Sequence, residues 1–187
     1  MHITLIDNYD SFTYNLVHYL EELNVNLTVM KNDSIDWSVL DNTNAIVLSP
    51  GPGLPNESND LLLVIERYHL QKPMLGVCLG MQALAVFFGS TLENQKEVKH
   101  GVSEMISIKY PGVLFRGIET ETQVGLYHSW KINLGEDSLF LETAHSENKV
   151  LMSMEHQSLP LYGVQFHPES VMTIEGKKMI RNFVDSI

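Results

Sequence analysis

The chain has 187 residues, of which 44% are hydrophobic and 19% are charged, a composition typical of a folded domain rather than a disordered segment. Its formal net charge of -11 argues against a nucleic-acid-binding face, because such a face needs clustered Lys and Arg side chains. No apolar run approaches the roughly 20 residues that cross a bilayer, and a single cysteine excludes an intramolecular disulfide. We therefore expect one cytoplasmic domain over residues 1–187, without a membrane segment.

In the first half of the chain, short apolar runs alternate with longer amphipathic stretches, a pattern that predicts parallel strands covered by helices. Strands are predicted over residues 3–6, 25–30, 45–49 and 74–77. The first helix should follow Asp10 and Ser11, both suitable N-cap residues. Two more helices are predicted over residues 61–68 and 79–88, the second ended by Gly89.

Beyond Ser90 the pattern changes to short strand-like pieces, over residues 104–109, 139–142, 150–154 and 161–166. A terminal helix is predicted over residues 173–184, where apolar side chains recur at helical spacing. Together these elements predict an α/β fold with an open, mixed, mainly parallel sheet and flanking helices.

The only cysteine, Cys78, lies between Gly76 and Gly80, where a predicted strand ends and a predicted helix begins. A nucleophile on such a sharp turn needs small neighbours, because its backbone is strained and the chain passes close by. The positive end of the following helix favours a thiolate, and its free N–H groups can bind an oxyanion. The alternative is an inert core residue, because a lone cysteine is among the most buried residue types.

A second motif, His167-Pro168-Glu169, follows the strand predicted over residues 161–166. Proline favours extended geometry in the residue before it, and side chains two positions apart in an extended chain project to the same side. His167 and Glu169 are therefore expected to be neighbours, completing a Cys-His-Glu relay with Cys78. The alternatives are a structural histidine and a glutamate that stabilises the N-terminus of the last helix.

Residues 50–53, with the sequence Pro-Gly-Pro-Gly, follow another predicted strand and should share a sheet edge with Cys78. Proline lacks an N–H group, so Gly51 and Gly53 are the only backbone donors of this loop. The N–H groups of Gly51 and Leu79 would make an oxyanion hole. The alternative is a rigid turn with no part in chemistry.

Six motifs make the sequence resemble the class I glutamine amidotransferases, most closely the small subunits of anthranilate synthase and aminodeoxychorismate synthase. The resemblance covers the whole chain, and the motifs are residues 6–12, 49–53, 76–82, 100–101, 127–129 and 163–170. The fold that this resemblance implies is the flavodoxin-like α/β arrangement of that family.

The resemblance also implies a role for each site residue. Cys78 attacks the carboxamide of L-glutamine, His167 is the acid and base, and Glu169 orients it. The oxyanion is bound by Gly51 and Leu79. The substrate-binding residues are Gly51, Pro52, Gly53, Gln82, Ser129 and Trp130.

No metal or cofactor is implied. The released ammonia would pass to a chorismate-utilising synthase subunit, in a hetero-oligomer that makes a precursor of tryptophan or of para-aminobenzoate and folate. Residues 7–12 are a candidate region for contact with that partner.

Four positions depart from the family pattern, and none removes the triad: Met81 replaces a usual histidine, Val102 a lysine, Leu126 an arginine and Trp130 a leucine. Two other functions stay open on the sequence. One is a stand-alone cysteine hydrolase of γ-glutamyl bonds, and the other is a non-enzymatic flavodoxin-like binding module in which Cys78 is inert.

Overall fold

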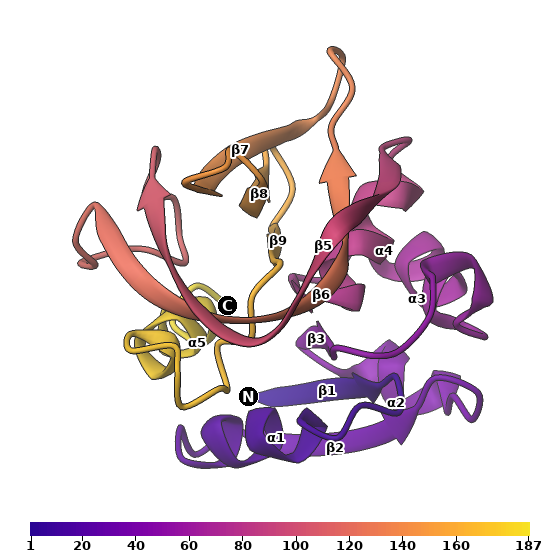
Figure 1. The fold of residues 1–187 in the computed structure, drawn as a ribbon. Coiled ribbons are helices and arrows are strands. Elements are labelled where there is room, and N and C mark those ends of the chain that lie inside the picture. The colour runs from indigo at the N-terminus through magenta and orange to yellow at the C-terminus, as the bar shows by residue number, and fades with distance from the viewer.

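The computed structural model describes residues 1–95 and 98–187, and over that part of the chain it contains one nine-stranded sheet with helices against it (Figure 1). The strands are β1 (His2–Asp7), β2 (Asn26–Lys31), β3 (Ala45–Leu48), β4 (Met74–Val77), β5 (Thr91–Ile108), β6 (Glu121–Asn133), β7 (Phe140–Ser146), β8 (Leu151–His156) and β9 (Leu161–Val164). The helices are α1 (Thr13–Glu21), α2 (Trp37–Asn42), the 3₁₀ turn η1 (Pro55–Glu57), α3 (Leu61–Tyr68), α4 (Leu79–Phe87) and α5 (Gly176–Val184).

The sheet has a parallel part and an antiparallel part, in the order β2-β1-β3-β4-β9-β8-β7-β5-β6. The first five strands in that order are parallel to one another. Strands β8, β7, β5 and β6 continue the sheet by antiparallel pairing, and β5 and β6 form a long curved pair (Figure 1). The predicted α/β class, with a mixed sheet and flanking helices, is therefore confirmed.

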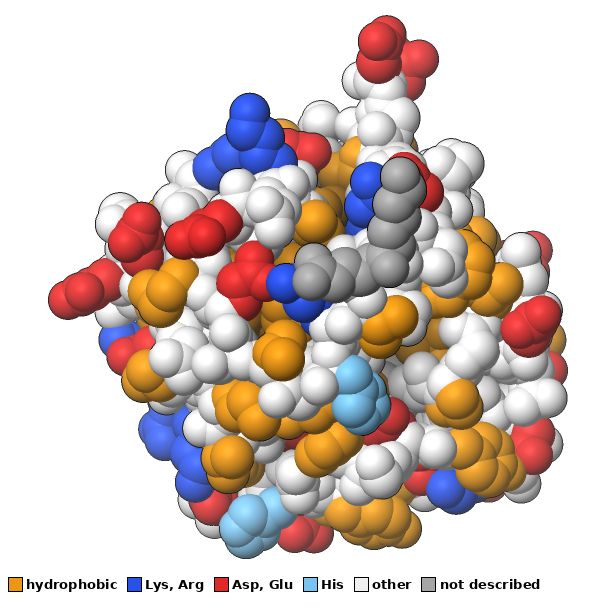
Figure 2. Space-filling view, in the orientation of Figure 1, with side chains coloured by type: hydrophobic (Ala, Val, Ile, Leu, Met, Phe, Trp, Pro, Cys, Tyr) orange, Lys and Arg blue, Asp and Glu red, His pale blue; other side chains and the backbone are white. Residues whose placement is uncertain are grey.

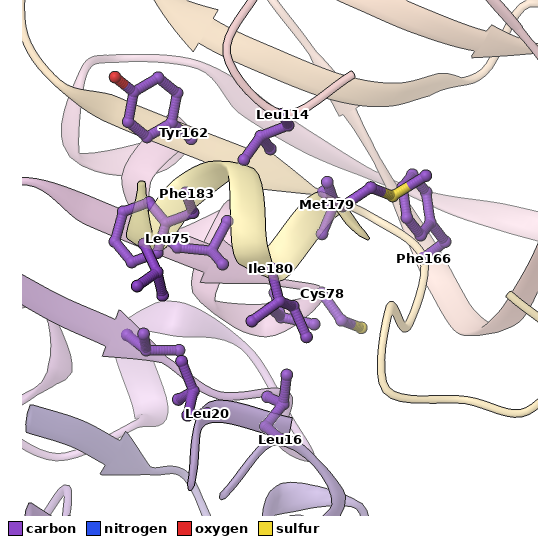
Figure 3. Packing of buried hydrophobic residues seen from close by; sticks show 14 of the residues in the cluster. Leu16, Leu20, Leu75, Cys78, Leu114, Tyr162, Phe166, Met179, Ile180 and Phe183 are labelled. Carbon is purple, nitrogen blue, oxygen red and sulfur yellow. The ribbon is translucent and has the colours of Figure 1, made fainter. Parts of the chain in front are cut away.

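The parallel strands send alternate side chains to opposite faces of the sheet, which gives two hydrophobic cores. In β3, Val47 belongs to one core and Ile46 to the other. Helices α1 and α5 cover the first face, where Ile180 and Phe183 pack with Leu16 and Leu75 (Figure 3). Helices α3 and α4 cover the second face. Each fully buried aliphatic or aromatic side chain of these cores contributes roughly 1.5–3 kcal/mol of hydrophobic stabilisation.

In the first half of the chain the predicted strands and helices are found, each within about a residue or two of its predicted bounds. The predicted N-cap of α1 is wrong: the helix begins at Thr13, and Phe12 is its N-cap without a side-chain hydrogen bond. Asp10 instead accepts a hydrogen bond from the N–H of Phe12 at 2.8 Å, closing a turn before the helix. The sequence pattern also did not predict α2, whose N-cap is Asp36.

The second half departs further from the prediction. The piece predicted over residues 104–109 is only the end of β5, and β6 was not predicted at all. The predicted strand 161–166 ends at Val164. The predicted helix 173–184 begins only at Gly176, because the hydroxyl of Thr173 donates to the carbonyl of His167 at 2.6 Å and holds the preceding segment in a turn.

On the face shown in Figure 2, acidic side chains are spread widely and the basic ones lie in small separate groups among hydrophobic and neutral surface. Across residues 1–95 and 98–187, no helix is both long and apolar enough to pass through a bilayer.

Candidate active site

The predicted site residues gather at the carboxyl ends of three neighbouring parallel strands. Residues 50–53 follow β3, Cys78 follows β4, and His167 comes three residues after the end of β9. These strands are adjacent in the order β3-β4-β9 and run in the same direction. Because parallel strands end at the same edge of a sheet, segments far apart in the sequence meet at this rim.

Cys78 occupies a strained turn between β4 and α4. Its φ of 51° and ψ of -102° are rare for a residue with a side chain, and such a conformation costs about 1–3 kcal/mol. Hydrogen bonds hold it in place: its N–H donates to the carbonyl of Val164 at 2.8 Å, and its carbonyl accepts from the N–H of Gln82 at 3.0 Å. The sulfur points away from Ile180 and the core beneath helix α5 (Figure 3). Helix α4 begins at the next residue, so its positive end adjoins the thiol.

Two glycines are required here by close packing. A Cβ on Gly80 would lie 2.3 Å from the carbonyl oxygen of Leu48, so only glycine lets α4 start against β3. A Cβ on Gly51 would lie 2.6 Å from the Cβ of Asn8 and 2.7 Å from Leu79. The 50–53 loop therefore rests directly on the start of α4.

Asn8 fastens the base of that loop. Its side-chain amide donates to the carbonyl of Ser49 at 2.8 Å, and its own N–H donates to the Ser49 hydroxyl at 2.8 Å. Asn8 and Ser49 are both buried. Part of the 6–12 motif thus has a structural role, which is to hold the Pro-Gly loop on the rim.

His167 and Glu169 form a buried pair. The imidazole Nδ1 lies 2.7 Å from the Oε1 of Glu169, and the two residues are only 2% and 1% exposed. Burial lowers the pKa of His167, but the nearby Cys78 sulfur and the hydrogen-bonded carboxylate of Glu169 outweigh it and raise that pKa to about 10. At neutral pH the ring is therefore an imidazolium. The alternative that Glu169 begins the last helix is wrong, because α5 begins at Gly176.

Two aromatic rings enclose the imidazole. The ring centroids of Tyr127 and Phe12 lie 4.8 and 5.7 Å from that of His167, both in edge-on arrangements, and 5.0 Å from each other. Sequence reasoning placed both aromatics in motifs but assigned neither a contact with the histidine. This packing limits the rotation of the ring and keeps water from it.

A pocket of about 200 Å³ opens beside Cys78. It is lined by Gly51, Pro52, Gly53, Cys78, Gln82, Tyr127, His128, Ser129 and Trp130. All the residues predicted to bind substrate thus line one pocket together with Cys78, whereas Leu79, His167 and Glu169 are buried in its surroundings.

Sequence reasoning gave no role to two residues of this site. Gln165 is fully buried, and its side-chain Nε2 lies 3.5 Å from the sulfur of Cys78. His128 is 4% exposed, and burial is the main cause that lowers its pKa, so its imidazole is neutral at neutral pH. Both belong to motifs of the resemblance, but a buried amide or imidazole leaves no periodicity or spacing signal of its own.

The four departures from the family pattern lie in different environments. Met81 and Leu126 are buried core side chains, and Val102 is 41% exposed. Trp130 alone among them lines the pocket. Among the described residues, no group of three or more His, Cys, Asp or Glu is arranged to hold a metal ion.

The chain matches the family model described as glutamine amidotransferase class-I over residues 4–187. It is 42% identical to aminodeoxychorismate synthase component 2 of Escherichia coli, over 97% of this chain and 98% of that one. It is 39% identical to aminodeoxychorismate/anthranilate synthase component 2 of Bacillus subtilis, over 98% of this chain and 96% of that one. Among solved structures, a candidate GMP synthase subunit from Thermoplasma acidophilum superposes with a TM-score of 0.88 at 32% identity, covering 99% of this chain and 92% of that one. The chain therefore belongs to the class I glutamine amidotransferases.

Proposed function

We propose that this chain hydrolyses L-glutamine to glutamate through a thioester on Cys78 and supplies the ammonia to a synthase subunit that aminates chorismate. The observation that carries the proposal is a strained cysteine at the N-terminus of α4, beside the buried His167–Glu169 pair and at the wall of a pocket of about 200 Å³. A cysteine, an acid–base histidine and an orienting carboxylate are what acyl transfer from an amide requires.

In the first half of the reaction, the Cys78 thiolate adds to the carboxamide carbon of glutamine. The N–H groups of Gly51 and Leu79 hold the developing oxyanion. His167, as an imidazolium whose pKa is raised to about 10, gives its proton to the departing nitrogen. Ammonia leaves, and a glutamyl thioester and a neutral imidazole remain.

In the second half, the neutral His167 takes a proton from a water molecule, and the resulting hydroxide attacks the thioester. Glutamate departs, and the thiolate and imidazolium are restored. Glu169 keeps Nδ1 protonated throughout, so that Nε2 is the atom that exchanges the proton. The amino-acid end of the substrate lies against Gln82, Ser129, Trp130 and the 50–53 loop.

The partner is the finer part of the proposal. One relative is named for aminodeoxychorismate synthase and another for both synthases, which supports a component II role within a hetero-oligomer. In the candidate contact region 7–12, Asp7 and Asn8 are buried whereas Tyr9 is 51% exposed, so Tyr9 is the side chain we expect the partner to cover. We further propose that residues 1–187 act as one domain, which is supported by the single sheet that includes strands from both halves of the chain. We place this domain in the cytoplasm as part of the same proposal.

The direct test uses Cys78 as the only cysteine of the chain. An electrophilic glutamine analogue should label it stoichiometrically, as read by intact mass, and should label no other residue. Wild type and Cys78→Ser are then assayed for glutamate release with the synthase partner. Full activity in Cys78→Ser would refute the nucleophile, and absence of labelling would favour an inert binding module.

The partner is tested by copurification from the native host, followed by identification of the amine formed from chorismate and glutamine. We expect weak glutaminase activity in isolation and a rise in the complex. If the chain released ammonia equally fast with and without a synthase subunit, and copurified with no synthase, it would instead be a stand-alone hydrolase of γ-glutamyl bonds.

A further inference from the structure

A buried amide lies on the protein side of the nucleophile, away from the pocket. Gln165 directly follows β9, its backbone N–H donates to the carbonyl of Met152 at 2.8 Å, and its side chain has no exposure. The side-chain Nε2 donates to the sulfur of Cys78 at 3.5 Å. The side-chain oxygen accepts from the Nε2 of Gln82 at 3.1 Å. Gln165 therefore links the nucleophile to a residue of the pocket wall.

We propose that Gln165 is a catalytic residue whose side-chain amide stabilises the Cys78 thiolate by a hydrogen bond, and that Gln82 strengthens this donor when it holds substrate. The role of Gln82 during substrate binding rests on the proposed glutaminase function. The hydrogen bond from Gln165 to the Cys78 thiolate does not depend on which substrate the site takes.

The environment makes the donor effective. Cys78 is 7% exposed and Gln165 fully buried, so water supplies little of the hydrogen bonding that an anionic sulfur needs. A hydrogen bond to a charged group is stronger than one between neutral groups, and more so in a low-dielectric interior. The imidazolium of His167 supplies the opposite charge, whereas Gln165 supplies a fixed dipole that stays in place after the His167 proton has left with ammonia.

The hydrogen bond from Gln82 makes the Gln165 amide a stronger donor to the sulfur. Hydrogen bonds in a chain polarise one another, so a donor whose oxygen already accepts a bond donates more strongly from its nitrogen. Gln82 lines the pocket and is 3% exposed. A substrate group that accepts from or donates to Gln82 therefore changes how well Gln165 stabilises the sulfur, and this couples occupancy of the pocket to the state of the nucleophile.

The test is the pH profile of Cys78 alkylation by iodoacetamide, read by intact mass on the full chain between pH 5.5 and 10. It needs no glutamine turnover, so it fails independently of the proposed function. Gln165→Met keeps side-chain length and removes the donor. We expect alkylation about tenfold slower than wild type at pH 6.5 and an equal rate at pH 10, which lies above the usual pKa of a cysteine thiol. Gln165→Glu, which faces the sulfur with a carboxylate, should be slower still at pH 6.5.

Ser153→Ala is the matched control. Ser153 is buried on the neighbouring strand β8, and its hydroxyl donates to the carbonyl of Gly163 in β9 at 2.8 Å without touching Cys78. Its alkylation profile should match wild type. A Gln165→Met profile that also matches wild type, or that is lowered equally at every pH, would show a packing role and overturn the proposal.

Two further measurements complete the test. Gln82→Met should slow alkylation at pH 6.5 about threefold, and the double variant Gln82→Met/Gln165→Met should lose no more than Gln165→Met alone. Fully additive losses would overturn the link through Gln82. Should Gln165→Met not fold, the side-chain ¹⁵N signal of Gln165 in wild type is followed with pH. We expect it to shift with the alkylation midpoint and to stay constant in Cys78→Ser, and a signal that ignores the Cys78 ionisation would refute the donor.

Discussion

Replacement of Glu169 by glutamine removes the negative charge beside His167 and keeps a side chain of nearly the same shape. The Nδ1 and Oε1 atoms are 2.7 Å apart, and both side chains are almost completely buried. Two unit charges about 4 Å apart at an effective dielectric constant near 20 attract by about 4 kcal/mol. At 1.36 kcal/mol per pKa unit, that attraction is comparable to the rise in the His167 pKa from 6.5 to about 10, which Cys78 shares.

Glu169→Gln should therefore remove about half of that rise, and the imidazolium should lose its proton at a lower pH. We expect the alkaline limb of the kcat profile for glutamate release to move down by about two pH units. At pH 9 the rate should fall about tenfold, because a general acid whose pKa lies about two units lower is mostly deprotonated there, whereas the wild-type imidazolium is not. KM should change little, since Glu169 does not line the pocket.

The assay is steady-state glutamate release by the complex between pH 6 and 10. Glu175→Gln is the matched control: Glu175 is the N-cap residue of α5, outside the site, and its variant should keep the wild-type profile. A Glu169→Gln enzyme with an unshifted alkaline limb and a kcat within threefold of wild type would refute the electrostatic account of the pair.

Gly80→Ala would place a Cβ 2.3 Å from the Leu48 carbonyl, so we expect a loss of about 1–3 kcal/mol in denaturant unfolding and of most glutaminase activity; wild-type values for both would contradict the packing argument. Asp36→Ala removes an N-cap that accepts from two backbone N–H groups of α2, far from the chemistry, and should cost about 1 kcal/mol of stability with kcat unchanged. Burial keeps the pKa of His128 below 6.5, so as the pH falls the His128 imidazole takes up a proton in the unfolded chain before it does so in the folded one. The folded state therefore loses stability relative to the unfolded state as the pH falls below 6.5. His128→Gln should reduce the fall in unfolding free energy between pH 7 and 5 by up to about 1.4 kcal/mol per pH unit, and an unchanged slope would show that His128 is not the group.

The elements predicted best from sequence are those whose evidence is local. The strand Met74–Val77 and the helix Leu61–Tyr68 have the predicted bounds, because each is an uninterrupted apolar or amphipathic run. The helix α2 has six residues, too few for a periodic pattern, and its signal is the capping side chain of Asp36. Strand β5 was predicted only at its end because its pairing with β6 shifts register between His100 and Val102, where the extra residue lies on β5 and breaks the alternation that predicts strands.

The site could be predicted only in part for the same reason. The elbow at Cys78 and the His167-Pro168-Glu169 turn each carry a local signal, so both could be singled out as candidates from the residues alone. The proximity of the two motifs cannot be predicted in the same way. Strands β4 and β9 are neighbours in the sheet, but strands β5 to β8 lie between them in the sequence. The family resemblance supplied that contact, whereas Gln165, which no local rule singles out, became visible only through its distance from the sulfur.

The pairing of β4 with β9 is what assembles the site. The N–H of Cys78 donates to the carbonyl of Val164, the last residue of β9, so the strand that leads to His167 also holds the strained elbow. Gln165 continues the same segment. A register slip of one residue would reverse which side chains face the rim and remove the backbone bond to Cys78 together with both of its side-chain partners. The docking of β9 beside β4 therefore brings the backbone anchor of Cys78, the side-chain amide of Gln165 and the His167–Glu169 pair to the rim together.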